Sequence, residues 1–274
     1  MNTIRKSVIA GSWYPGNPSV LRKDIQHYFD AASGTDVQGE IIGLIAPHAG
    51  YVYSGQVAAH AYHLIRRNQY DAVIIIGPSH RVAFHGVSVF SRGGYETPLG
   101  VVPVAEDLAT KIKKASSLVA DIPMAHLQEH SLEIQLPFLQ VALNDFSFLP
   151  LMMGDQDADT CRKLASAIYQ TVQEKKILIV GSSDLSHFYN YHTAKKMDAI
   201  VLEHIRNGDA EGLLRSLENG TVEACGGGPM AVVMSVAHMM KADKPYLLKY
   251  ANSGDVTGDK NSVVGYAAAV FCKE

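Results

Sequence analysis

Cysteine is scarce in this 274-residue sequence: Cys161, Cys225 and Cys272 are the only three, and they lie far apart. An odd number of widely spaced cysteines does not form a disulfide framework and is typical of a protein from a reducing compartment. No Cys-x-x-Cys pair occurs. This absence excludes zinc ribbons and thioredoxin-like redox proteins, and we expect a cytoplasmic protein.

The sequence also lacks an excess of charge of either sign. Its 24 lysines and arginines nearly balance its 27 aspartates and glutamates, so the net charge is −3. A nucleic-acid-binding protein that works through bulk positive charge is therefore excluded. No apolar run approaches the ~20 residues that span a bilayer, and residues 1–15 carry no signal-peptide pattern. We expect neither nucleic acid nor a membrane as partner.

Short apolar runs recur along the chain. Four of them have the length of a strand and end at glycine, proline or polar residues: 41–46, 72–76, 148–153 and 177–181. Continuous apolar runs of this length are typical of strands buried on both faces of a parallel sheet. Two later strands are predicted at 246–252 and 263–271, joined by a turn region at 253–261, and a weaker strand at 86–90.

Helical patterns separate these strands. They cover 55–66, with Ser54 as a possible N-cap, and 105–114, 131–143, 159–173, 193–206 and 229–241. Strands that alternate with helices indicate βαβ units. We therefore predict a single α/β domain over residues 1–274, with a mainly parallel central sheet and helices on both faces.

Histidine is abundant, with twelve residues, and three histidines follow predicted strands. His48 and His80 each come two to four residues after a strand, and His187 follows a third strand together with Asp184. In an open parallel sheet the functional site lies beyond the carboxyl ends of the strands. Imidazole is a common ligand for zinc, copper and iron and a common acid or base near neutral pH. The spacing therefore predicts a shared polar site.

Two histidines leave a metal site incomplete, and Cys225 is the best candidate for a third ligand. It precedes the glycine run 226–228 and a predicted helix, whose N-terminus would favour a thiolate. Cys161 lies in a helical pattern and Cys272 in the last strand, so both are interpreted as small buried hydrophobic residues.

A competing motif lies at residues 126–130. His126, Glu129 and His130 match the H-x-x-E-H pattern of inverted zinc peptidases. Pro123 places His126 at or before the start of a helix, where the two histidines would not share one face. The alternative interpretation is a loop that reaches the strand-end site, with His130 as a proton-transfer or supporting group.

Several motifs together resemble the Memo family, also called AmmeMemoRadiSam system protein B. The resemblance runs from about residue 5 to residue 271 and rests on segments in the family's order: Ala46-Pro47-His48-Ala49-Gly50-Tyr51, Gly77-Pro78-Ser79-His80, Glu129-His130-Ser131, Ser182-Ser183-Asp184 with Ser186-His187, and Cys225-Gly226. It implies a fold similar to the class III, LigB-type extradiol dioxygenases, which bind non-haem iron at one edge of an α/β sheet.

The resemblance also implies roles for the site residues. His48, His80 and Cys225 would hold copper or non-haem iron, with zinc as a further possibility, and Asp184, His187 and His130 would act as catalytic groups. A cysteine replaces the carboxylate of the dioxygenase ligand set, which shifts the preference toward softer metals. The expected function is redox or dioxygenase-like chemistry on an unknown small molecule or protein.

The alternative function is that of a non-catalytic adaptor that binds peptides or phosphopeptides in the same pocket. The family name further suggests AMMECR-type and radical-SAM proteins as partners.

Overall fold

A nine-stranded mixed sheet forms the centre of the computed structural model, which describes residues 3–34, 36–143, 145–173 and 175–274. The strand order is β10-β12-β2-β9-β3-β8-β4-β7, and β11 pairs with β12 outside this path. The strands are β2 (Glu40–Ala46), β3 (Ala72–Pro78), β4 (Val87–Val89), β7 (Val119–Asp121), β8 (Phe148–Met153), β9 (Ile177–Ser182), β10 (His187–Tyr189), β11 (Lys244–Asn252) and β12 (Val263–Lys273). A smaller sheet combines β1 (Ile4–Arg5), β5 (Gly94–Thr97) and β6 (Gly100–Pro103).

Four central strands, β2, β9, β3 and β8, run parallel to one another. Strands that follow one another in the sequence are not neighbours here, because β9 lies between β2 and β3, and β3 lies between β9 and β8. The outer strands run differently: β12 is antiparallel to β2, β11 and β10 are antiparallel to β12, and β4 is antiparallel to β8. The sheet is therefore mixed, with a parallel centre, rather than parallel throughout.

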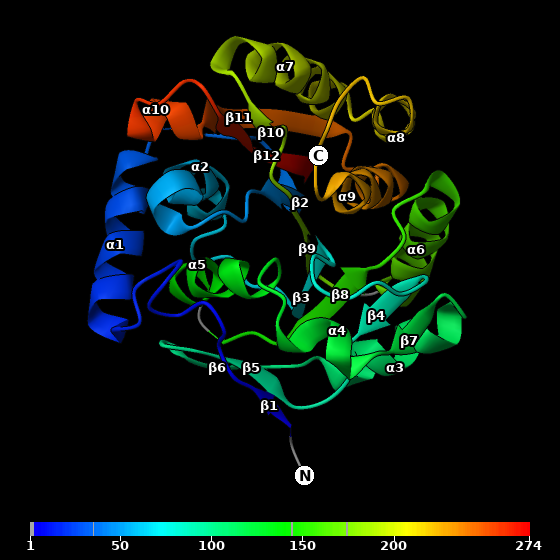
Figure 1. Ribbon diagram of the computed structural model, residues 1–274. Helices are drawn as coiled ribbons and strands as arrows, with labels where there is room; N and C mark the ends of the chain where they lie inside the picture. The colour runs from blue at the N-terminus through cyan, green and yellow to red at the C-terminus, as the bar shows by residue number, and fades with distance from the viewer. Residues whose placement is uncertain (1–2, 35, 144, 174) are drawn as a thin grey trace.

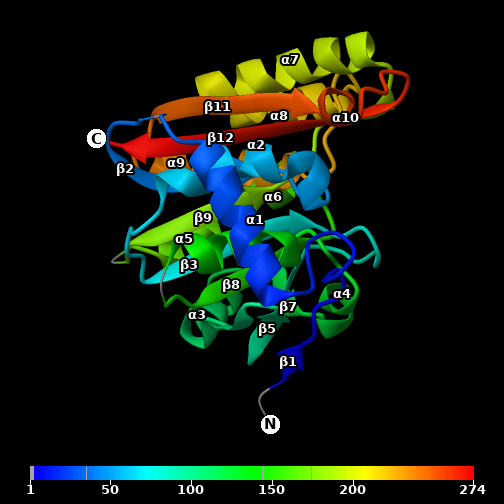
Figure 2. The same ribbon diagram turned by 90° about the vertical axis from the view of Figure 1, so that its left-hand side faces the viewer.

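Helices cover both faces of this sheet, as predicted. In Figure 1 one side carries α1 (Pro18–Ala31), α2 (Tyr51–Leu64) and α5 (Leu136–Ala142), and the other carries α6 (Ala158–Thr171) and α9 (Gly227–Met239). Figure 2 views the molecule from the α1 side, with β11 and β12 in its upper part, below α7. The remaining helices are α3 (Glu106–Ala115), α4 (Pro123–Leu127), α7 (Tyr191–Asn207), α8 (Ala210–Glu218), α10 (Ser253–Thr257) and the 3₁₀ helix η1 (Glu133–Gln135).

The apolar sequence of the central strands explains why both faces are covered. In β3, Ile74 and Ile76 pack into the core on the side of α3, α6 and α9, whereas Val73 and Ile75 pack into the core on the side of α1, α2 and α5. Successive side chains of a strand point to opposite faces, so a continuous apolar run needs a layer of helices on each side. Among the described residues, no helix is both long enough and apolar enough to cross a bilayer.

Several local predictions were wrong. Helix α2 begins at Tyr51 after Gly50, and Ser54 lies inside it, where its Oγ donates to the carbonyl of Ala49. The predicted helix 131–143 is instead η1 followed by α5, and the turn region 253–261 contains α10. Helix α1 was missed although Asn17 caps it and Pro18 opens it, a recognised start signal.

Candidate metal centre and its cleft

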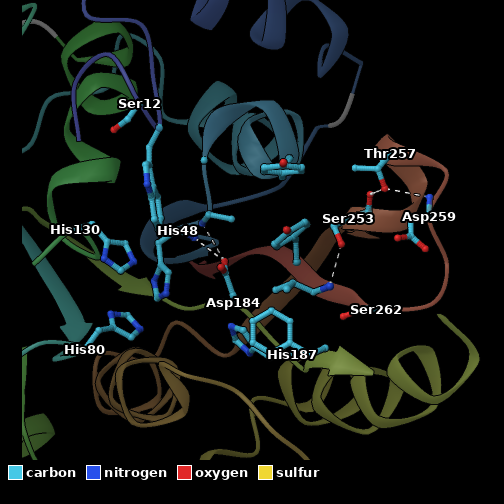
Figure 3. Close-up of a pocket in the computed structure, with 17 residues that line it drawn as sticks. Ser12, His48, His80, His130, Asp184, His187, Ser253, Thr257, Asp259 and Ser262 are labelled. Carbon is cyan, nitrogen blue, oxygen red and sulfur yellow. Dashed lines mark hydrogen bonds between the residues drawn. The ribbon is translucent and has the colours of Figure 1, made fainter. Parts of the chain in front are cut away.

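The strand order brings three predicted site segments to one edge of the sheet. His48 follows β2, His80 follows β3, and Asp184 follows β9, which lies between these two strands. Because the three strands are parallel neighbours, their carboxyl ends meet at the same edge. The segment after β9 continues into β10, so that His187 also reaches this edge. Figure 3 shows these side chains around one opening.

His48, His80 and Cys225 form a group with the spacing of a metal site. One ligand atom from each residue lies within 4.8 Å of the others. The Sγ of Cys225 is 3.0 Å from His48 Nε2, although the two residues are separated by 177 positions in the chain. Cys225 reaches this place because it lies two residues before the start of α9, whose first turn packs against the end of β9 at Gly181.

A glycine makes that approach of α9 to β9 possible. A Cβ atom on Gly226 would lie 2.2 Å from the carbonyl oxygen of Ser182 and 3.0 Å from the Cα of Ser183. Real Cβ atoms do not approach backbone this closely. The residue after Cys225 must therefore be glycine for the thiol to reach His48.

The thiol itself is less acidic than the sequence suggested. Burial, and then the nearby carboxyl of Asp184, raise the pKa of Cys225 above its usual range, although backbone N–H groups oppose the shift. The predicted thiolate-favouring effect of the helix N-terminus is therefore outweighed by desolvation. The backbone N–H of Asp184 donates to Sγ across 3.3 Å.

A buried carboxylate, Glu129, holds two of the histidines in place. Its Oε1 lies 2.8 Å from His80 Nδ1 and 3.2 Å from His130 Nδ1, and its Oε2 accepts from the backbone N–H of His80 at 2.5 Å. It also accepts from the backbone N–H groups of His130 and Ser131. Burial raises the pKa of Glu129, but the contacts with His80 and His130 outweigh this effect, and the pKa falls to about 2.

Glu129, His80 and His130 also have the spacing of a second metal site. The oxygens of Glu129 already accept hydrogen bonds from the N–H groups around them. Glu129 is therefore better explained as a support that holds His80 for the group of His48, His80 and Cys225. Carboxylates that accept the outer N–H of a metal-binding histidine have this role in many metal sites. The sequence drew attention to Glu129 only as part of a junction, and nothing local revealed its contact with His80.

His130 packs between His80, a candidate metal ligand, and Trp13, the only tryptophan of the sequence. Its ring is stacked on that of His80, with centroids 4.7 Å apart, and its centroid lies 4.3 Å from that of Trp13. Burial lowers the pKa of His130 to about 4, against the opposing charge of Glu129. Burial likewise lowers the pKa of His48 well below its usual range. Both rings are therefore neutral at pH 7, the form that binds metal ions.

Asp184 and His187 lie on the other side of the opening. Asp184 Oδ1 accepts from the backbone N–H of His48 at 2.7 Å, and burial raises the pKa of its carboxyl to about 7. His187 lies 3.6 Å from Glu223, and burial lowers its pKa against the opposing effect of Glu223. A carboxyl that titrates near neutral pH is suited to proton transfer.

A cleft of about 760 Å³ lies above these residues and is shown in Figure 3. The four residues His48, His80, His130 and His187 line it, with Asp184 at its floor. Aromatic side chains form much of the remaining wall: Trp13, Tyr53, Phe188 and Tyr266. This size and this mixture of apolar walls with a few polar groups are typical of a small-molecule site.

The zinc-peptidase interpretation of residues 126–130 is wrong. His126 lies in α4, which ends at Leu127, and His130 lies beyond that end, so the two histidines do not share a helix face. His126 is fully buried, with Nε2 2.9 Å from Ser88 Oγ and Nδ1 2.7 Å from Tyr95 Oη. Both of its nitrogens are therefore occupied by hydrogen bonds within the core.

Known proteins resemble this chain over nearly its full length. The family described as "Memo-like protein" matches residues 5–270. A "MEMO1 family protein" of Methanobrevibacter smithii is 38% identical over 98% of this chain and 99% of its own length, and one of Methanopyrus kandleri is 37% identical over 97% and 98%. A further "MEMO1 family protein", from Sulfolobus acidocaldarius, is 38% identical over 98% and 99%.

One solved structure has a related fold. An uncharacterized protein from Escherichia coli K12 superimposes with a TM-score of 0.57 at 14% identity, covering 84% of this chain and 100% of that one. At this identity the likeness concerns the fold alone. The full-length family match, by contrast, agrees with the motifs gathered at the sheet edge, and the chain belongs to the Memo family.

Proposed function

We propose that this protein binds a transition metal ion through His48, His80 and Cys225 and uses it for redox, dioxygenase-like chemistry on a small molecule or peptide in the cleft. The observation that carries the proposal is the convergence of three ligand atoms within 4.8 Å, delivered by three separate elements. Three protein ligands that leave further positions open are the usual arrangement of a catalytic metal site.

The donor set fits a metal ion. His48 is neutral at pH 7 because burial lowers its pKa, and its Nε2 faces Cys225. Ionised Glu129 can only accept, so His80 Nδ1 carries a hydrogen, and in the neutral ring His80 Nε2 bears the lone pair. Two imidazoles and a cysteine, whose thiol would lose its proton on binding a metal ion, favour copper, with iron and zinc as alternatives. Such an ion, when bound, would supply a Lewis acid and, if copper or iron, an electron-transfer centre.

The protein's own residues supply the remaining chemistry. Asp184, with a pKa of about 7, can hold or release a proton at its carboxyl. His187 and His130 line the same cleft and are neutral at pH 7, so each can accept a proton from a bound molecule. The aromatic walls exclude water from the reacting group and orient an apolar part of the substrate.

Metal analysis of the untagged protein tests this proposal. We expect about one copper or iron ion per chain after reconstitution, and loss of that metal in Cys225→Ala. Cys272→Ala is the matched control, because Cys272 is buried in β12 opposite Ile41, at the end of β2 that is remote from His48, and it should retain the metal. Absence of stoichiometric metal in the reconstituted wild type would overturn the proposal. Stoichiometric zinc with no measurable redox wave would overturn its redox part only.

A second candidate function is that of an adaptor that binds peptides or phosphopeptides in this cleft. The observation that favours it is the exposed aromatic rim: Phe188 is 75% exposed and Tyr53 is 44% exposed at the opening. Exposed apolar groups beside a cleft are typical of a binding surface. Calorimetry of the metal-free and zinc-loaded protein with a peptide and its phosphorylated form tests this function, and absence of binding in both states excludes it.

We further propose AMMECR-type and radical-SAM proteins of the same organism as partners, on the strength of the family name. Co-purification of the untagged chain with each protein, and with a Phe188→Ala, Tyr53→Ala variant, tests whether the cleft rim contributes. Neither protein co-purifying with the wild type would exclude them.

A further inference from the structure

We infer that Ser182 fixes the proton of His48 on Nδ1. The lone pair of His48 Nε2 is thereby directed toward Cys225 and the candidate metal centre. Ser182 is the last residue of β9, and its Oγ lies 3.0 Å from His48 Nδ1. The consequence of this tautomer for metal binding rests on the proposed function. The position of the proton follows from hydrogen bonds alone and does not. Ser182 does not line the cleft and acts through His48, so it is a positioning residue.

The hydroxyl hydrogen of Ser182 is already used elsewhere. Ser182 Oγ lies 2.6 Å from the carbonyl oxygen of Ser131. A carbonyl oxygen can only accept a hydrogen bond, so Ser182 must donate its single hydrogen to Ser131. Both lone pairs of Ser182 Oγ are then left for other neighbours.

One of these lone pairs faces Gln135. The orientation of the Gln135 amide follows from its other contacts: one end is 3.0 Å from the carbonyl oxygen of Pro47 and must be the NH₂ group, and the other accepts from the hydroxyl of Tyr62 at 2.8 Å. The same NH₂ group lies 2.8 Å from Ser182 Oγ and donates to it. Gln135 thus occupies the first lone pair of Ser182.

The second lone pair of Ser182 can be used only by a donor. His48 Nδ1 is the neighbour that remains, so it must carry a hydrogen, whether the ring is neutral or charged. In the neutral ring the other nitrogen, Nε2, then bears the lone pair, and it is this atom that lies 3.0 Å from Cys225 Sγ. The tautomer of His48 follows from three hydrogen bonds that do not involve the cleft.

Burial makes this arrangement stringent. Ser131 and Ser182 are 0% exposed and Gln135 is 1% exposed. Water therefore does not replace a missing partner, and reversing one hydrogen bond would leave a buried polar group unpaired. His80 reaches the same tautomer by a different route, because Glu129 accepts from its Nδ1. In the neutral rings, two unrelated supports thus leave the lone pair on the same nitrogen, Nε2.

The experiment measures the tautomer directly by ¹⁵N NMR of histidine-labelled, metal-free protein, with His48 assigned from a His48→Gln sample. We expect the wild type to carry its proton on Nδ1. In Ser182→Ala we expect a substantial Nε2–H population and a zinc dissociation constant raised 10- to 100-fold, about the effect of losing a supporting partner. Ser182→Thr keeps the hydroxyl and should recover the wild-type tautomer and most of the affinity.

Ser88→Ala is the matched control. Ser88 is also a fully buried serine whose hydroxyl contacts a histidine, His126, but it lies outside the site. It should lower stability without changing the His48 tautomer or zinc affinity. An Nε2–H tautomer in the wild type, or an unchanged tautomer in Ser182→Ala, overturns the inference. If the wild type binds no metal but shows the predicted tautomer, the proposed function fails and the positioning role stands.

Discussion

His126 should make the protein sensitive to acid. This side chain is fully buried between Ser88 and Tyr95, and burial, with the charge of Arg5, lowers its pKa from 6.5 to about 3. Ser88 donates its hydroxyl to the carbonyl of Ile122, so His126 Nε2–H donates to Ser88 and Nδ1 accepts from Tyr95. Protonation of Nδ1 would break the last of these bonds inside the core.

The magnitude follows from the two pKa values. Between pH 6.5 and pH 3 the unfolded chain binds a proton at His126 and the folded chain does not, so stability falls as the pH falls. The contribution is intact above pH 6.5 and, on going from pH 8 to pH 4.5, about 2.7 kcal/mol of the free energy of unfolding is lost. His126→Gln cannot titrate, and at pH 8 it should be less stable than the wild type by about 1–3 kcal/mol. That difference should shrink by about 2.7 kcal/mol at pH 4.5.

Urea unfolding of the metal-free protein at pH 8, 6 and 4.5 measures this difference, with the fluorescence of Trp13 and circular dichroism as two probes. His85→Gln is the control, because it makes the same replacement at a fully exposed side chain and removes no core contact. If the wild type and His126→Gln differ by the same amount at all three pH values, the folded protein does not depress the pKa of His126 and the reasoning is refuted. His126→Gln should also keep its metal, in contrast to the zinc-peptidase hypothesis.

Three further predictions concern the supports of the site. Glu129→Gln keeps the shape of the side chain but places an NH₂ group beside N–H donors. It should weaken zinc binding about 10- to 100-fold in a chelator competition. Unchanged zinc affinity would show that Glu129 does not support His80. Arg5→Met leaves the buried carboxylate of Glu133 without its ion pair and should lower the free energy of unfolding in urea by about 3–5 kcal/mol. Arg162→Met breaks an exposed ion pair and should lower it by at most about 1 kcal/mol. Equal losses in the two variants would contradict the argument from burial. Gly226→Ala should lower both Tm and zinc affinity, because its Cβ overlaps the backbone of β9, and a variant with wild-type values would show that α9 can shift without moving the thiol.

Much of the central fold could be predicted because it depends on local pattern. The apolar runs at 41–46, 72–76, 148–153 and 177–181 became β2, β3, β8 and β9, since a strand buried on both faces has no polar positions. The strand order and the antiparallel edge could not be predicted in this way. Pairing of β12 with β2 joins residues more than 200 positions apart, and hydrophobic periodicity carries no information about which strand becomes a neighbour.

The same division applies to the site. His48, His80 and Asp184 could be placed together from sequence, because the carboxyl ends of parallel strands share an edge and each motif directly follows a strand. Cys225 was proposed as a ligand from its residue type and family motif, but its distance from His48 depends on the packing of α9 against β9 and on the absence of a side chain at Gly226.

The supporting residues were decided by the tertiary structure alone. Glu129 and Ser182 carry no local signal for their roles, since Glu129 contacts His80 across 49 positions of the chain and Ser182 contacts His48 across 134. The acidity of Cys225 also depended on tertiary structure: the sequence suggested a thiolate from a neighbouring helix end, whereas burial beside Asp184 favours the thiol. The sequence by itself determined which chemical groups stand at the strand ends. Only the folded chain determined their protonation and which of their atoms face one another, because desolvation and hydrogen-bond partners are properties of the surroundings and not of the residue.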